Sequence, residues 1–144
     1  MRRILVPIES ANPARTTAAV AEVVRIYAQE PVTVHLLNVQ PLVNGHVAML
    51  FDSKELDQLR LRAGAEDLAT AKALLESHNV PFSSSVQIGR SAETIARTAR
   101  DLGCDRIVMG QDAASGRAGK LFGSLAQQVR HLIGGSGNCQ VIGP

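Results

Sequence analysis

The sequence has few aromatic residues, few cysteines and no cluster of basic charge. Among 144 residues there are no tryptophans, one tyrosine and three phenylalanines. So few aromatic rings leave little material for the base-stacking surfaces of single-stranded nucleic-acid-binding proteins. The 15 lysines and arginines are scattered along the chain and nearly balanced by 13 acidic residues, giving a net charge of +2. A nucleic-acid partner is therefore not indicated.

Metal sites, disulfides and membrane segments are also not indicated. Cys104 and Cys139 lie in apolar strand-like contexts, and no Cys-x-x-Cys occurs, which favours buried, reduced thiols over a disulfide. The four histidines show no paired ligand spacing. The chain shows no signal peptide at its start and no apolar run near the roughly 18 residues of a membrane span. We therefore expect a soluble, cytoplasmic protein with no membrane partner.

Apolar patterning predicts alternating strands and helices. The expected strands are residues 3–9, 32–39, 81–88, 104–110 and 139–142, and the expected helices are residues 13–30, 53–78, 91–102 and 123–133. No repeat or linker divides the chain, so residues 1–144 are expected to form one domain. Alternation of this kind predicts an α/β fold: a single-domain α/β/α sandwich with a five-stranded parallel sheet and right-handed crossovers.

Several local signals refine this prediction. Gly64 interrupts the long second helix, which indicates either a kink or tight packing there. The serine run at residues 83–85 suggests a weakly buried edge strand. Ser91 is a candidate N-cap, and Gly103 stands where a left-handed helix end is expected. Residues 40–51 show no period and are interpreted as an irregular connection.

The segment from residue 107 to residue 124 is the most informative, because it leads from an apolar strand through a glycine-rich loop to an expected helix start at Gly123 and Ser124. Backbone amides at a helix start attract anions, so this loop is a candidate phosphate cradle. Gly119-Lys120 is followed by Leu121, so the loop is not of the Walker type, and the glycine spacing does not fit a Rossmann loop. Equally, Ser124 has a purely structural explanation as an N-cap.

The spacing of Gly110, Ala113 and Gly123-Ser124 resembles the Gly-x2-Gly-x9-Gly-Ser/Thr loop of the universal stress protein family. The resemblance extends over essentially the whole chain, since residues 3–9, 34–39 and 104–110 are similar to the family's first, second and fourth strands. It implies the adenine nucleotide alpha-hydrolase-like fold with strand order 3-2-1-4-5. A crevice then opens at the carboxyl ends of strands one and four, where ligands of open α/β sheets bind.

The resemblance also implies a function and a set of site residues. It implies a stress-response or regulatory module, not an enzyme, with ATP or a related adenine nucleotide as ligand and Mg²⁺ as a candidate companion. The implied nucleotide-binding residues are Pro7, Ile8, Glu9, Val39, Met109, Gly110, Ala113, Gly123, Ser124 and Leu125. Relatives commonly form homodimers through their last strands, although here that strand runs directly into Gly143-Pro144, and proline cannot donate to a ladder.

Three departures from the family pattern keep alternatives open. Glu9 replaces the usual aspartate, Ala113 replaces the second loop glycine, and Asp112 places a carboxylate beside the expected phosphates. Arg117 and Lys120 either offset that charge or are exposed loop residues. These departures predict reduced affinity; the alternatives are a nucleotide-free interaction protein with a degenerate site, or a slow ATPase.

Overall fold

The computed structural model describes residues 2–9, 13–41, 53–110, 116–134 and 139–142, with the backbone alone for residues 53 and 116–124. Nine elements follow one another along these residues: β1 (Arg2–Pro7), α1 (Pro13–Gln29), β2 (Val32–Gln40), α3 (Ser53–Ser77), β3 (Phe82–Ile88), α4 (Ser91–Leu102), β4 (Arg106–Val108), α5 (Gly116–Ile133) and β5 (Gln140–Ile142). The predicted alternation of strands and helices is thus confirmed.

The five strands form one parallel sheet in the order β3-β2-β1-β4-β5, as the family resemblance implies. β1 lies at the centre, with Ile4 opposite Val34 on one side and opposite Arg106 on the other. From β1 the chain passes outward to β2 and β3, and it then crosses to β4 on the other side of β1. The direction of the crossovers therefore changes between β1 and β4. The carboxyl ends of β1 and β4 mark this change.

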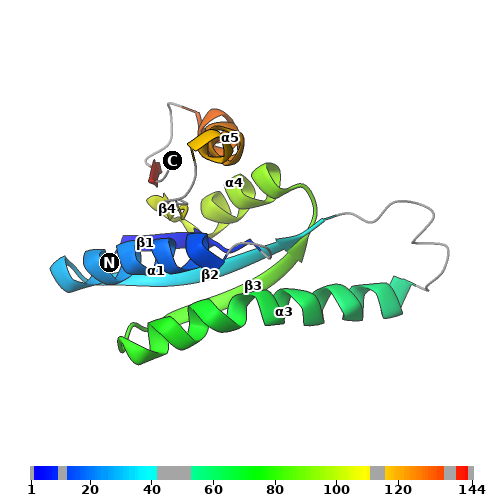
Figure 1. Ribbon diagram of the computed structural model, residues 1–144, viewed down its shortest axis with the longest axis horizontal. Helices are drawn as coiled ribbons and strands as arrows, with labels where there is room; N and C mark the ends of the chain where they lie inside the picture. Colours follow the sequence, from blue (N-terminus) through cyan, green and yellow to red (C-terminus); the bar gives the residue numbers. More distant parts are fainter. Residues whose placement is uncertain (1, 10–12, 42–52, 111–115, 135–138, 143–144) are drawn as a thin grey trace.

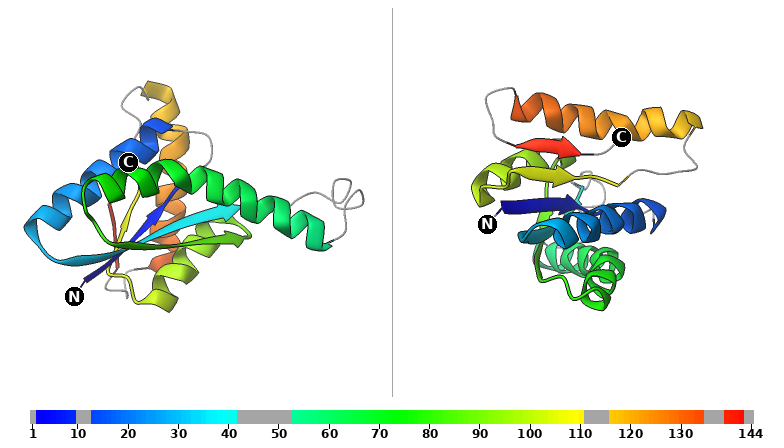
Figure 2. Two further views of the ribbon diagram at one scale, coloured as in Figure 1. Left: turned by 90° about the horizontal axis from the view of Figure 1, so that it is seen from below. Right: turned by 90° about the vertical axis from the view of Figure 1, so that its left-hand side faces the viewer.

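Helices cover both faces of the sheet and create two hydrophobic cores (Figures 1 and 2). Ile4 and Val6 of β1 face α1 and α3, whereas Leu5 faces the other way, toward α4 and α5. All three side chains are completely buried, as expected for a parallel strand covered on both faces. The protein is therefore an α/β/α sandwich.

α3 runs without interruption past Gly64, where it packs directly on β3. A Cβ at Gly64 would lie 2.7 Å from Cγ2 of Val86, closer still to its Cγ1, and 3.0 Å from Oδ1 of Asn38. Of the two interpretations of Gly64, tight packing is therefore the correct one. β3 itself is an edge strand, and its residues are half-buried or exposed, as the serine run predicts.

Three details differ from the sequence predictions. Arg90, not Ser91, is the N-cap of α4, and its side chain makes no capping hydrogen bond, whereas Gly103 does end the helix in the left-handed conformation with φ 67°. The apolar spacing of Leu125, Val129 and Leu132 predicts that all three lie on the inner face of the last helix, but Leu132 is 40% exposed.

The third difference concerns the start of α5, which begins at Gly116 and not at Gly123 and Ser124. Arginine, alanine, lysine and leucine between residues 117 and 121 favour helix strongly enough to continue it through the intervening glycine. The backbone amides of Gly123 and Ser124 therefore lie inside α5 and not at its start, so the expected anion cradle at that pair does not form at a helix terminus.

Candidate functional site

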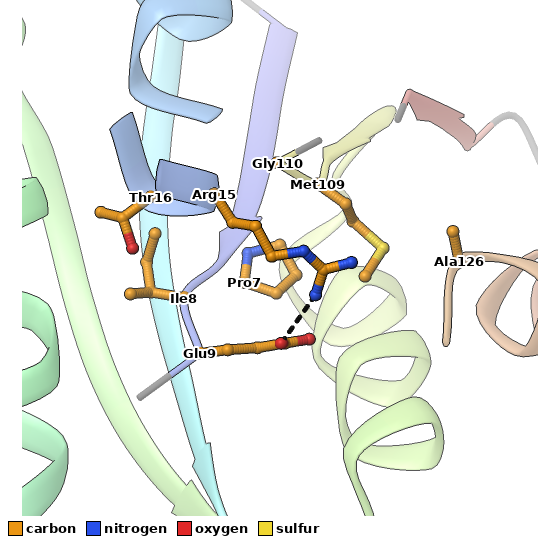
Figure 3. A pocket seen from close by; sticks show the side chains of 8 residues that line it. All are labelled: Pro7, Ile8, Glu9, Arg15, Thr16, Met109, Gly110 and Ala126. Atoms are coloured by element: carbon orange, nitrogen blue, oxygen red, sulfur yellow. Dashed lines mark hydrogen bonds and ion pairs between the residues drawn. The ribbon is translucent and has the colours of Figure 1, made fainter. Parts of the chain in front are cut away.

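The candidate site lies where β1 and β4 end, at the change of crossover direction. Pro7, Ile8 and Glu9 come from the end of β1, and Met109 and Gly110 follow β4. Together with Arg15 and Thr16 of α1 and Ala126 of α5, these residues line one small cavity (Figure 3). Four segments that are distant in the sequence thus converge on the crevice.

Hydrogen bonds fix the backbone at the end of β1. The amide of Ile8 donates to the carbonyl of Leu37 at 2.8 Å, which continues the β1–β2 ladder by one residue. The side-chain nitrogen Nδ2 of Asn38, a residue that is only 1% exposed, donates to the carbonyl of Ile8 at 2.9 Å and to Oδ2 of Asp67 at 3.3 Å. Because Asn38 joins β1 to α3 through these bonds, the position of Glu9, one residue further on, is set by buried structure.

Glu9 forms an ion pair with Arg15 inside the crevice. Nη1 of Arg15 donates to Oε2 of Glu9 at 2.8 Å, a short, charge-assisted hydrogen bond. The Arg15 side chain is 9% exposed, whereas that of Glu9 is 39% exposed. The guanidinium therefore occupies the interior of the crevice, and the carboxylate closes it from the solvent side.

Gly110 is required by close packing of α1 against the end of β4. A Cβ at this position would lie 2.6 Å from the carbonyl carbon of Arg15 and even closer to its oxygen. Both are backbone atoms of the first turn of α1, so they cannot move aside as a flexible side chain can. The first glycine of the family-like loop thus has a structural role here that is independent of any phosphate.

The cavity between these residues is small. Its volume is about 20 Å³, which is room for about one water molecule. Small-molecule sites typically measure about 300–1,000 Å³. An adenine ring therefore enters this crevice only if the side chains that line it move.

The structure brings together half of the site residues that the resemblance implies. Pro7, Ile8, Glu9, Met109 and Gly110 share the cavity. Val39 packs among the side chains beneath α4, and Leu125 lines a separate groove between α4 and α5, so neither lines this cavity. The remaining three are not tested: Ala113 lies outside the described residues, as does Asp112, and for Gly123 and Ser124 only the backbone within α5 is described.

Three residues of the cavity were not predicted from the sequence: Arg15, Thr16 and Ala126. Arg15 carries one detectable signal. It stands in the first turn of α1, which contains no acidic residue, and a cation is unfavourable at the positive end of a helix dipole. A basic residue at that position indicates a specific anionic partner, which the structure shows to be Glu9. Ala126 carries no such signal, because its role is set only by where α5 packs.

Titratable groups elsewhere have perturbed proton affinities but do not assemble into a second site. Burial raises the pKa of the Cys104 thiol to about 11 and also raises the pKa of the Cys139 thiol; both thiols are free, Cys104 buried and Cys139 half-buried. Burial lowers the pKa of His35, whose ring nitrogens contact the hydroxyls of Ser83 and Ser85 at 2.7 and 2.8 Å. Within the described ranges, His, Cys, Asp and Glu form no group of three that could hold a metal ion.

Comparison with known proteins identifies the class and then the family. An open parallel sheet in the order 3-2-1-4-5, with a crevice at the β1/β4 switch, defines an α/β protein of the adenine nucleotide alpha-hydrolase-like fold. The family model of the universal stress protein family matches residues 1–133, so the chain belongs to that family. Among curated proteins, none matches the chain significantly in sequence.

Solved structures of the same fold confirm the architecture. A universal stress protein from Archaeoglobus fulgidus superposes with a TM-score of 0.70 at 18% identity, covering 99% of this chain and 98% of the other. The Archaeoglobus fulgidus protein in complex with dAMP gives 0.66 at 16% identity, covering 99% and 97%. A universal stress protein in complex with cAMP gives 0.71 at 14% identity, covering 99% and 96%. In the part of this chain that the structure describes, no helix combines the length and the apolar character of a membrane span.

Proposed function

We propose that this chain is a stress-response regulatory module that binds ATP or a related adenine nucleotide, with reduced affinity, in the crevice between β1 and β4. The observation that carries the proposal is the convergence of Ile8, Glu9 and Gly110 at the crossover switch, around a polar pair. Structures of similar fold are known in complex with dAMP and with cAMP, which favours the same ligand class here.

Reduced affinity follows from the closed state of the crevice. Before a nucleotide can enter, the side chains that fill the crevice must move, which requires the bond between Arg15 and Glu9 to break. For a pair with one exposed partner this costs on the order of 1–2 kcal/mol, or about 5- to 30-fold in affinity. Glu9 is the one carboxylate among the described residues around the cavity, and Arg15 neutralises it, so we do not expect efficient ATP turnover.

Isothermal titration with ATP tests the proposal, with and without Mg²⁺ and with CTP as the control for the base. We expect saturable heat for ATP, weaker heat for CTP, and a rise in the unfolding temperature that grows with ATP concentration. Amide chemical-shift changes should map to Ile8, Glu9 and Gly110, while Asn79 and Val80, before β3 and outside the cavity lining, serve as the unaffected control. No heat and no thermal shift at millimolar ATP would refute nucleotide binding.

The second candidate is a nucleotide-free interaction protein of the same fold. The cavity volume of about 20 Å³ favours it, because the crevice has room for about one water molecule while the Glu9–Arg15 pair is formed. The same titration separates the two functions. Silence toward every adenine nucleotide supports the second, whereas saturable ATP binding that perturbs the amide of Glu9 excludes it.

We also propose that the protein acts in the cytoplasm as a homodimer. β5 is an edge strand of only three described residues, so a dimer formed through it is expected to be weak. Light scattering over a concentration series should show a monomer–dimer equilibrium, and a constant monomer mass at every concentration would contradict the homodimer.

A further inference from the structure

Arg15 carries a positive charge that is buried in the crevice. Its guanidinium lies inside the crevice with the residue 8% exposed, and it projects from the first turn of α1 across Pro7 toward Met109 (Figure 3). A buried cation is costly unless an anion accompanies it. Here the Glu9 carboxylate fills that requirement at 2.8 Å. A change that removes Glu9 from the pair is therefore favoured when a second anion takes its place.

The two members of the pair differ in how easily they can move. The Glu9 side chain is 39% exposed and can turn toward solvent at little cost, whereas the Arg15 side chain is 9% exposed. The first turn of α1 contributes a further partial positive charge and no acidic residue. When Glu9 turns away, the Arg15 guanidinium and the first turn of α1 remain as positive groups at the crevice, which suits an incoming phosphate.

We propose that Arg15 is the phosphate-recognising residue of this site. On binding, a phosphate of the adenine nucleotide replaces the Glu9 carboxylate on the guanidinium, and Glu9 is released to accept hydrogen bonds from the nucleoside. The exchange is one anion for another, and guanidinium suits the tetrahedral oxygens of phosphate. This inference rests on the proposed function and adds to it a selectivity: phosphorylated adenosine is bound in preference to adenosine.

A simple obstruction by Arg15 makes the opposite prediction. If the side chain only filled the crevice, its removal would increase the affinity for adenosine and for AMP by the same factor. If it binds phosphate, its removal lowers the affinity for AMP relative to adenosine. The ratio of the two affinities therefore separates the two roles, whatever the absolute affinity.

The experiment titrates adenosine and AMP into the wild-type protein and into Arg15→Ala, Arg15→Lys and Arg25→Ala. Arg25→Ala is the matched control, because Arg25 also belongs to α1 and also pairs with a glutamate, Glu22, but its side chain is 59% exposed. We expect the wild type and the control to prefer AMP by roughly 10- to 100-fold, the range expected for charge-assisted hydrogen bonds. Arg15→Ala should bring the ratio close to one, and Arg15→Lys should keep part of it.

A second variant keeps the test valid if Arg15→Ala does not fold. Glu9→Gln removes the competing charge at a more exposed position, so the proposal predicts a larger AMP-to-adenosine ratio than in the wild type. An unchanged ratio in Glu9→Gln, or in Arg15→Ala, overturns the role of Arg15 but leaves nucleotide binding intact. Absence of binding for both ligands in the wild type and in every variant refutes the proposed function itself, and the role of Arg15 with it.

Discussion

Replacing Gly64 with alanine should destabilise the protein although it improves the helix. Alanine is favoured over glycine in a helix interior by about 1 kcal/mol. Against this gain, the new methyl group would lie 2.7 Å from Cγ2 of Val86 and nearer to its Cγ1, whereas carbon atoms pack best at about 3.5–4.0 Å. Overpacking typically costs about 1–3 kcal/mol. Because two methyl carbons of Val86 would lie under 3.0 Å from the new one, we take the upper part of this range, about 2–3 kcal/mol, and expect a net loss of about 1–2 kcal/mol in the free energy of unfolding.

The same substitution should have the opposite sign once Val86 is shortened. Val86→Ala removes both of the methyl groups that meet the new Cβ, and leaves Oδ1 of Asn38, 3.0 Å away, as the remaining tight contact. In that background the helical preference should prevail, and Gly64→Ala should be neutral or stabilise by up to about 1 kcal/mol. The coupling energy of the cycle is then about 2 kcal/mol.

Urea unfolding of the four proteins, followed by circular dichroism, measures this cycle. Equal m-values across the set would show that the variants unfold to similarly exposed states, which the comparison requires. If Gly64→Ala stabilises the wild type, or destabilises both backgrounds equally, then α3 does not contact β3 as described.

Three further predictions concern the crevice and the buried titratable groups. Gly110→Ala should destabilise by about 3 kcal/mol in urea unfolding, because the new Cβ would lie 2.6 Å from the backbone carbonyl carbon of Arg15; a loss under about 1 kcal/mol would contradict the packing of α1 on this glycine. The pKa of the Cys104 thiol is raised from 9.0 to about 11, so the free energy of unfolding should be constant below pH 9 and fall toward pH 11, because the unfolded chain loses its proton first. Cys104→Ala should flatten this decline, and an identical slope in the variant would contradict the burial of the thiol. Burial lowers the pKa of His35 below 6.5, so stability should fall as the pH drops below 6.5, where the unfolded state binds the proton more readily; a pH titration of His35→Gln should lack this component.

Most of the fold could be predicted because apolar residues at buried positions recur along the sequence with the period of a strand or a helix. Apolar runs such as residues 4–6 and helical spacings such as Ile95, Ala96 and Ala99 reflect the two covered faces of the sheet, and all of these side chains are buried as expected. The strand order came from the family resemblance, since periodicity fixes no order. Helix ends were less predictable: glycines near residues 116–123 resembled a loop, but the strong helix formers between them extend α5 to Gly116.

The candidate site was predictable only in part. Residues adjacent to strand ends, such as Ile8 and Gly110, follow directly from the topology, because parallel strands end at one edge of the sheet. Arg15 does not, since its place in the crevice depends on how the first turn of α1 packs and on the side-chain conformation that reaches Glu9. Because α1 packs against residue 110, a glycine is needed there for structural reasons. The motif alone does not distinguish this structural role from phosphate binding.

The central position of β1 has a consequence for how the chain folds as it is synthesised. One edge of β1 pairs with β2 soon after both leave the ribosome, but its other edge waits for β4, and the bond between Arg3 and Asp105 spans 102 residues. At about 5–20 residues per second, synthesis of these 102 residues takes roughly 5–20 seconds. During that interval β1, whose last four residues end up buried, exposes an unpaired edge, so the nascent chain is most vulnerable to aggregation, and most dependent on chaperones, before its last third has emerged.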